Sequence, residues 1–222
     1  AYSLETSGSH LVNGVQMVPG APGFNEEASY KMWAEVLGLS SVRVAAAVVA
    51  TSGNDTLVGS SGDDTLGGLA GADSLSGGGG NDTFNVTNTA DDGNDTIDGG
   101  IGTDTIVVAS ARTLVFAAVD ANITNVENIV VGAGSSLTLT GQTEGFNITG
   151  SSGNETIVAG TGNDTIAAGA GNDSITAGAG SDSISGDGGD DTFNVTNTAD
   201  DGNDTINGGS GTEIGRASCR ER

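Results

Sequence analysis

Acidic side chains recur every nine residues along more than half of this chain. Read in nines from Ala50 and again from Gly150, the sequence contains twelve intact nonapeptides with a carboxylate at the sixth position. Glycine always occupies the fourth position. Carboxylates beside glycine-rich turns, whose carbonyl oxygens are not covered by side chains, are donors that suit calcium. The candidate metal ligands are Asp55, Asp64, Asp73, Asp82, Asp95, Asp104, Glu155, Asp164, Asp173, Asp182, Asp191 and Asp204.

Other metals suit these residues less well. Zinc and copper favour cysteine and histidine ligands, and the chain has one cysteine (Cys219) and one histidine (His10). Magnesium requires a stricter octahedral geometry than a series of turn carbonyls provides. An isolated aspartate in a turn is usually a turn cap, but twelve acids in register favour metal binding. We therefore expect several calcium ions to bind.

The residues around each acid predict a tight turn followed by a short strand. Glycine at the fourth position allows a positive φ or a close backbone approach, and Asn or Asp at the fifth tolerates the left-handed region. Thr or Ser at the seventh position and Leu, Ile or Phe at the eighth favour a strand. Because neighbouring strand residues face opposite sides, the eighth residue should point inward and the seventh and ninth outward. One apolar residue in nine makes a narrow core, which only stacking of repeats can close.

In residues 50–107 and 150–212 the repeats resemble the RTX (haemolysin-type calcium-binding) family, whose pattern is G-G-x-G-x-D-x-U-x. The resemblance implies an all-β fold, a right-handed parallel β-roll or β-solenoid with two nonapeptides in each turn. It also implies that calcium lies between turns, held by repeats two apart. The implied pairs are Asp55 with Asp73, Asp64 with Asp82, Asp164 with Asp182, and Asp173 with Asp191.

Two features depart from the regular pattern. Glu155 has a longer side chain than aspartate, so we expect the Glu155–Asp173 site to differ from the others. A four-residue insert, VTNT, precedes the repeats that contain Asp95 and Asp204. We expect it to break the frame and to make those two sites less regular.

The remaining segments have other compositions. Residues 1–49 predict a short helix that begins after Asn25 and ends near Gly38, either a cap on the solenoid or the edge of an upstream domain. Residues 108–149 lack the nonapeptide but contain alternating, strand-like runs. They predict calcium-free rungs that continue the solenoid, the alternative being a bulge or a small projecting subdomain.

The last ten residues, 213–222 (EIGRASCRER), resemble translated sequencing-adapter DNA, and we expect a non-biological tail; a genuine basic tail is the alternative. Together with the missing initiator methionine, this predicts an internal fragment of a longer protein. Residues 82–97 recur unchanged at 191–206, which predicts a higher-order repeat, unless the recurrence is an assembly artefact.

Charge and motifs exclude several functions. A net charge of −23 argues against nucleic-acid binding, which needs a basic face. No apolar run approaches the roughly 18–20 residues of a membrane span. A lone histidine leaves no catalytic triad or H-E-x-x-H motif, so we expect no enzyme activity in this part of the parent protein.

Two classes of function remain. The first is a calcium-binding module of a secreted bacterial protein, folding on calcium outside the cell, most simply as a stalk in a large adhesin or surface protein. The alternative is the RTX part of a secreted protease, lipase, epimerase or cytolysin whose catalytic domain lies elsewhere. The family resemblance implies type I secretion and an extracellular or cell-surface location. The long internal duplication favours the stalk.

Overall fold

The structure is a computed structural model, and in its described residues every regular element is a β-strand. It describes residues 10–12, 15–17, 50–87, 95–116, 122–195 and 204–217. None of these residues belongs to a helix that could cross a membrane.

The chain forms two compact units, Ala1–Val44 and Ala45–Arg222. In the first unit, β1 (His10–Val12) and β2 (Val15–Met17) pair in antiparallel fashion, in a segment for which no strand was predicted. The helix predicted after Asn25 lies outside the described residues.

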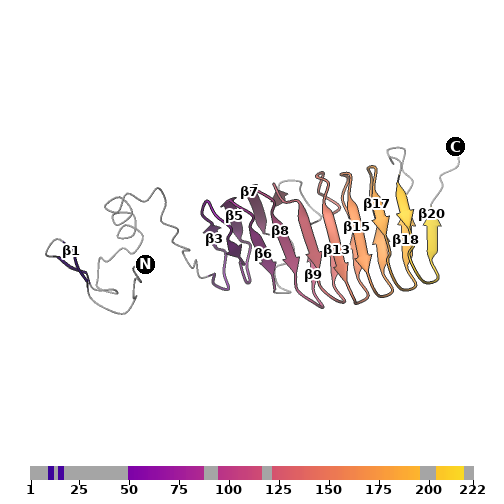
Figure 1. The fold of residues 1–222 in the computed structure, drawn as a ribbon, viewed down its shortest axis with the longest axis horizontal. Helices are drawn as coiled ribbons and strands as arrows, with labels where there is room; N and C mark the ends of the chain where they lie inside the picture. The colour runs from indigo at the N-terminus through magenta and orange to yellow at the C-terminus, as the bar shows by residue number, and fades with distance from the viewer. Residues whose placement is uncertain are drawn as a thin grey trace, which may run out of the picture. The chain divides into compact units, whose positions relative to one another are not determined.

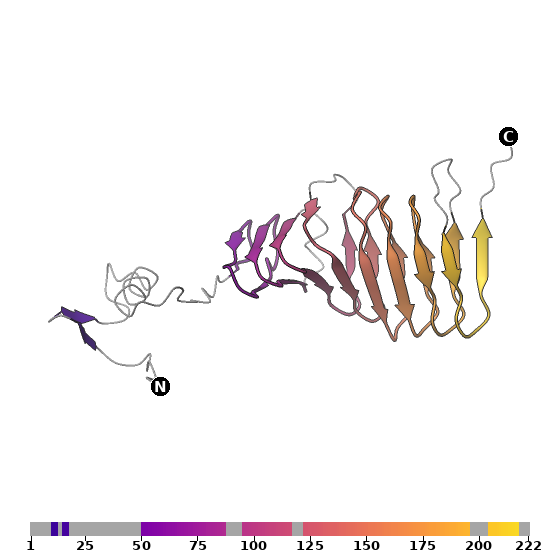
Figure 2. The ribbon, with the colours of Figure 1, turned by 45° about the horizontal axis from the view of Figure 1, so that its top comes forward.

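The second unit is a right-handed parallel β-solenoid of about 7 turns, stacked in sequence order (Figures 1 and 2). One eight-stranded sheet contains β4 (Thr65–Leu66), β6 (Thr83–Val86), β8 (Thr105–Val108), β11 (Asn128–Val131), β13 (Asn147–Ser151), β15 (Thr165–Gly169), β17 (Ser183–Ser185) and β19 (Thr205–Asn207). A four-stranded sheet contains β3 (Thr56–Val58), β5 (Ser74–Gly79), β7 (Thr96–Ile101) and β10 (Ile123–Thr124). A six-stranded sheet contains β9 (Thr113–Val115), β12 (Ser136–Thr138), β14 (Thr156–Val158), β16 (Ser174–Thr176), β18 (Thr192–Val195) and β20 (Ile214–Ala217).

The strand register confirms that two nonapeptides make one solenoid turn. Leu57 pairs with Leu75, and Ile157 pairs with Ile175, each 18 residues further along the chain. These eighth-position side chains are buried in the core, as the alternation of strand residues predicts. The seventh-position Thr and Ser residues are exposed or half-buried on the outside.

The four-residue inserts do not disturb the register, contrary to our expectation. Leu75 pairs with Ile97 and Ile184 with Ile206, so a turn of 22 residues replaces one of 18 while the strands stay aligned. The strand ladder therefore tolerates a longer connection, because register depends on the strands themselves and not on the loop that joins them.

The described residues of 105–116 and 122–151 contribute strands to the same solenoid and do not form a projecting subdomain. Between β8 and β11 the chain contributes to all three sheets: β10 is the last strand of the four-stranded sheet and β9 the first of the six-stranded sheet. Several of these rungs also bury a second apolar residue at the end of the strand or just after it, such as Val108, Val131 and Leu139. These rungs therefore bury more apolar side chain in each turn than the nonapeptides do.

The fifth position of the repeat behaves differently from our prediction. Among described residues, the non-glycine positions with positive φ are Leu69, Ala111, Asn125 and Asp187, and none is a fifth position. Fourth-position glycines do adopt positive φ, for example Gly171 at 132° and Gly180 at 134°. The Asn and Asp at the fifth position serve another purpose, described below.

Part of the adapter-like segment continues the solenoid, since β20 pairs with β18. The register sets Gly215 opposite the buried Phe193, while Ile214 lies opposite Thr192 and is 52% exposed. The apolar residue is therefore on the outer side, one position away from the repeat pattern. That residues 213–222 are non-biological stays a prediction.

Candidate metal centre

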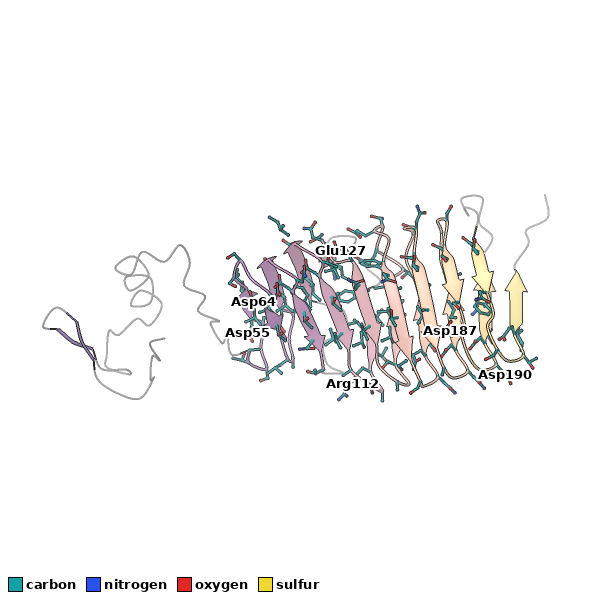
Figure 3. All side chains as sticks on the ribbon, in the orientation of Figure 1. Asp55, Asp64, Arg112, Glu127, Asp187 and Asp190 are labelled. Carbon is teal, nitrogen blue, oxygen red and sulfur yellow. The ribbon has the colours of Figure 1, made fainter. Side chains whose placement is uncertain are left out.

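The sixth-position acids form ladders along the solenoid, in which the main-chain N–H of one acid donates a hydrogen bond to the carboxylate of the acid one turn later. Asp73 Oδ1 accepts from the Asp55 N–H at 2.8 Å, and Asp82 Oδ1 from the Asp64 N–H at 2.7 Å. The side chains of Asp55 and Asp64 lie beside the first strands of the solenoid (Figure 3). All four pairs implied by the family resemblance are neighbours of this kind.

There are four such ladders in the described residues, with N···O distances of 2.6–3.0 Å between successive members. The 22-residue turns preserve them, so Asp95 and Asp204 occupy regular ladder positions. Ladder A contains Asp55, Asp73 and Asp95; ladder B contains Asp64, Asp82, Asp104 and Glu127; ladder C contains Glu155, Asp173, Asp191 and Glu213; ladder D contains Asp164, Asp182 and Asp204.

The second carboxylate oxygen is buried without a hydrogen-bond donor in many ladder members. Oδ2 is in this state in Asp73, Asp82, Asp104, Asp173 and Asp191, whose side chains are at most 2% exposed. A buried, unpaired carboxylate oxygen is costly, since its hydration is lost and nothing replaces it. These oxygens therefore fit a bound cation.

Carbonyl oxygens converge on the same places. A Cβ atom on Gly77 would overlap both Asp82 Oδ2 and the carbonyl oxygen of Gly99, one turn further along. A Cβ on Gly186 would likewise meet Asp191 Oδ2 and the Gly208 carbonyl. First-position glycine thus leaves a space bounded by oxygens from two adjacent turns, the donor set of a hard cation such as calcium.

Between two successive turns of the described solenoid, at most two acidic side chains can contribute ligands to one cation. Among the described residues, no three acidic, histidine or cysteine side chains gather where they could hold a metal ion. A cation between turns must then complete its shell with carbonyl oxygens, which suits calcium better than zinc.

Burial changes the pKa values of the ladder acids. It raises the pKa of Asp164 to about 7, opposed by the N–H of Phe146 and reinforced by the charge of Asp182. Burial similarly raises the pKa of Asp173 to about 6, with the Glu155 N–H opposing it. The pKa values of Asp82 and Asp191 are also raised, mainly by burial. The ionised ladder is therefore under electrostatic strain that a bound cation would relieve.

Glu155, the first member of ladder C, has hydrogen-bond donors on both carboxylate oxygens. Its Oε1 accepts hydrogen bonds from the Gly134 N–H at 2.8 Å and the Ser151 hydroxyl at 3.1 Å. Its Oε2 accepts from the Ser151 N–H at 3.1 Å. Both carboxylate oxygens thus already have donors, whereas Asp173, the next member of ladder C, has a donor on Oδ1 and none on Oδ2.

Two ladder members, Glu127 and Glu213, were missed: Glu127 lies outside the nonapeptides, and Glu213 follows the glycines of the incomplete repeat 208–212 but belongs to the segment set aside as adapter-like. Glu127 Oε2 accepts from the Asp104 N–H at 2.8 Å, and Glu213 Oε2 from the Asp191 N–H at 3.0 Å. A signal for Glu127 was present: Glu127-Asn128-Ile129 has the same acid, polar, aliphatic order as Asp104-Thr105-Ile106. Glu213 lies in the adapter-like segment.

At two places in residues 108–149, Ser135 and Phe146 precede a strand where the nonapeptides have an acid. Ser135 Oγ accepts the Arg112 N–H at 3.1 Å and donates to the Ala109 carbonyl at 2.9 Å. Phe146 lies where an acid would precede its strand, and its N–H donates to Asp164 Oδ1 at 2.8 Å. Neither side chain adds a carboxylate for a metal.

The fifth-position residues form a second, outer ladder that runs in the opposite sense. Asp63 Oδ1 accepts the Asn81 N–H, and Asn81 Oδ1 accepts the Thr103 N–H, both at 2.9 Å. Asn154, Asn163, Asn172 and Asp190 do the same in the second block. These side chains are exposed, and they join the tight turns of successive coils.

A parallel β-solenoid with buried, paired carboxylates between its turns defines a metal-binding repeat protein. The family model of RTX calcium-binding nonapeptide repeats matches residues 49–84, 89–109, 149–184, 169–195 and 198–214. These matches cover more than half of the chain, and the chain belongs to this family. No curated protein matches it.

Proposed function

We propose that this calcium-binding β-roll module is a non-catalytic stalk of a large, secreted bacterial surface protein and that it folds when it meets calcium outside the cell. The observation that carries its calcium dependence is the set of buried Oδ2 atoms that lack hydrogen-bond donors. The RTX match indicates the calcium-binding module itself. Secretion and the stalk role are inferred from the family and from the repeat arrangement.

The ladder acids and the glycine-turn carbonyls would hold the ions. Calcium supplies positive charge between two carboxylates that would otherwise repel each other, and so links one solenoid turn to the next. The hydrogen bond through Oδ1 sets the position of each carboxylate, as in Asp82, and leaves Oδ2 for the metal. First-position glycine keeps the space beside Oδ2 open.

The arrangement of blocks supports a stalk. Two nonapeptide blocks flank a set of rungs that lack the nonapeptide, and a 16-residue segment of the first block recurs in the second. Each turn stacks on the previous one in parallel, so further units can be added without altering those already present. The complete gene tests this: further copies of the unit would support a stalk, and a neighbouring catalytic domain would favour the enzyme or toxin alternative.

Paired substitutions test the calcium assignment. Asp82→Asn keeps an oxygen that can accept the Asp64 N–H but removes the buried charge, and Asp63→Asn makes the same chemical change at an exposed fifth position. We expect calcium-induced β signal in circular dichroism to need several-fold more calcium in Asp82→Asn. Asp63→Asn should titrate like the unaltered chain.

Two outcomes would contradict this assignment. One is a chain that is equally folded in excess EGTA and in calcium. The other is an equal shift of the calcium midpoint in Asp82→Asn and Asp63→Asn.

A further inference from the structure

Ladder B ends in a glutamate outside the nonapeptide pattern. Asp104 donates its N–H to Glu127 Oε2 at 2.8 Å, in the same way that Asp82 donates to Asp104 Oδ1 at 2.6 Å. Glu127 thus occupies the next carboxylate position of the ladder. Its side chain is exposed and lies near the end of the four-stranded sheet (Figure 3).

Asp104 contributes an oxygen without a hydrogen-bond donor. The side chain is 0% exposed, and its Oδ2 accepts no hydrogen bond. A Cβ on Gly99 would come within 2.6 Å of this oxygen, so Oδ2 lies in the same first-position space that Asp82 Oδ2 occupies beside Gly77. Asp104 Oδ2 therefore lies beside Gly99 in the same way that Asp82 Oδ2 lies beside Gly77.

The carbonyl of Asn125, from the next turn, takes the place that a glycine carbonyl has beside other ladder acids. β10 pairs with β7, with Ile123 opposite Ile97 and Thr124 opposite Asp98, so Asn125 follows opposite Gly99. A Cβ on Gly99 would overlap the carbonyl oxygen of Asn125, as one on Gly77 would overlap that of Gly99. Asn125 has φ 53°, and its side-chain amide donates to Asp98 Oδ1 at 2.8 Å. That hydrogen bond fixes the carbonyl where a repeat glycine would present its own.

The shorter turn explains why the ligand is a glutamate. Five positions separate Gly99 from Asp104, but only two separate Asn125 from Glu127. The main chain consequently follows a different path to the strand, and the extra methylene of glutamate lets the carboxylate reach the Asp104 N–H. The position is acidic even though the glycine pattern has been lost.

We propose that Asp104, Glu127 and the Asn125 carbonyl form a further calcium site, which closes ladder B where the calcium-binding block meets the apolar rungs. This proposal rests on calcium binding by the regular ladder. Calcium would there join β7–β8 to β10–β11, the place where the four-stranded sheet ends.

Counting bound ions tests the site. Calcium stoichiometry is measured by isothermal titration calorimetry on the full chain, on Glu127→Gln and on Glu144→Gln. The glutamine at 127 retains an acceptor for the Asp104 N–H, and Glu144 lies outside the four ladders. We expect Glu127→Gln to bind one calcium ion fewer and Glu144→Gln to bind as many as the unaltered chain. An unchanged stoichiometry in Glu127→Gln overturns the site.

A second measurement does not depend on the variant folding. Hydrogen–deuterium exchange of the unaltered chain should show calcium-dependent slowing, by at least several-fold, in peptides covering 99–105 and 123–128 together. Slowing confined to 99–105 overturns the proposal. If the unaltered chain binds no calcium at all, the proposed function fails; if it binds calcium and only Glu127 proves irrelevant, this inference alone fails.

Discussion

At the scale of single residues, the two oxygens of a ladder aspartate have different tasks. In Asp173, Oδ1 accepts the Glu155 N–H at 2.7 Å, while Oδ2 is buried with no donor. The first contact positions the carboxylate, and the second oxygen remains for a cation. An aspartate is well suited to this division because its short side chain reaches the N–H one turn away without exposing either oxygen to solvent.

The raised pKa values predict how the calcium-free chain responds to pH. Asp164 and Asp173 have folded-state pKa values of about 7 and about 6, above the ordinary aspartate value of 3.8. Groups with raised pKa values stabilise the folded state fully below their unfolded pKa, and this contribution is lost as the pH rises through the folded pKa. In EGTA, we expect the thermal midpoint to rise when the pH falls from 7.5 to about 5.

Calcium should reverse the direction of this effect. Protons and calcium compete for the same carboxylates, so the calcium concentration at which half of the chains are folded should increase as the pH falls below about 7.

The prediction for the calcium-free chain has its own contrary outcome. A thermal midpoint in EGTA that falls steadily on acidification between pH 7.5 and 5 would show that these acids are not desolvated in the folded chain.

Leu69 is a second-position residue in a conformation that suits glycine. Its φ is 69°, whereas the equivalent Gly78 and Gly169 have φ values of 98° and 103°. Because Leu69 is 46% exposed, its replacement sacrifices little burial. Relief of the left-handed strain, about 1–2 kcal/mol, should exceed the roughly 0.5–1 kcal/mol entropic cost of glycine.

We therefore expect Leu69→Gly to raise the thermal midpoint in saturating calcium. Ala170→Gly is the control, since Ala170 is exposed, has no positive φ and should become less stable by about 0.5–1 kcal/mol. If both variants lose stability equally, the backbone at Leu69 is not strained.

At the scale of elements, two kinds of rung hold the solenoid together. In the nonapeptides the second inward position is glycine or alanine, as in Gly77 and Ala168, and the ladder acids take part in the packing between turns. In the central rungs that position holds larger side chains such as Phe116 and Leu139. Among the described residues, twelve of the 26 buried hydrophobic side chains lie between residues 106 and 148. Apolar burial there replaces the contribution that the metal makes elsewhere.

This difference predicts unequal stability along the chain when calcium is removed. In EGTA, hydrogen–deuterium exchange should remain slow in peptides from 105–151 and become fast in those from 51–87 and 165–195. Calcium should slow exchange in all three regions. Uniform exchange across them in EGTA would mean that the central rungs do not fold independently of the metal.

At the scale of the whole molecule, the net charge of −23 is mostly a property of the repeats. The buried ladder acids bring like charges to neighbouring turns. Without a counter-charge, repulsion between these carboxylates destabilises the stacking of the turns. Calcium binding converts that repulsion into links between turns. We therefore expect the chain to gain order where calcium is abundant, in keeping with the function proposed above.

Much of the fold and of the metal ladders could be predicted from the sequence. A period of nine with one inward apolar residue determines the strand and its face, and two repeats in each turn bring acids 18 residues apart together. Asp164 and Asp182 show the result, since the Asp164 N–H donates to Asp182 Oδ1 at 2.8 Å. Stacking makes spatial neighbours from a constant sequence offset. The period of nine is a property of the sequence, and the two repeats in each turn were implied by the resemblance to the RTX family.

The features that do not follow the nonapeptide period became clear only from the tertiary structure. Glu127 joins ladder B because β11 pairs with β8, with Asn128 opposite Thr105, so that Glu127 lies opposite Asp104. The 22-residue turns keep the register because the strands, and not the inserts, determine it. The fifth-position side chains accept hydrogen bonds from the next turn instead of adopting left-handed backbone. Each of these outcomes depends on which backbone groups meet across turns, and that is a property of the stacked chain and not of any local segment.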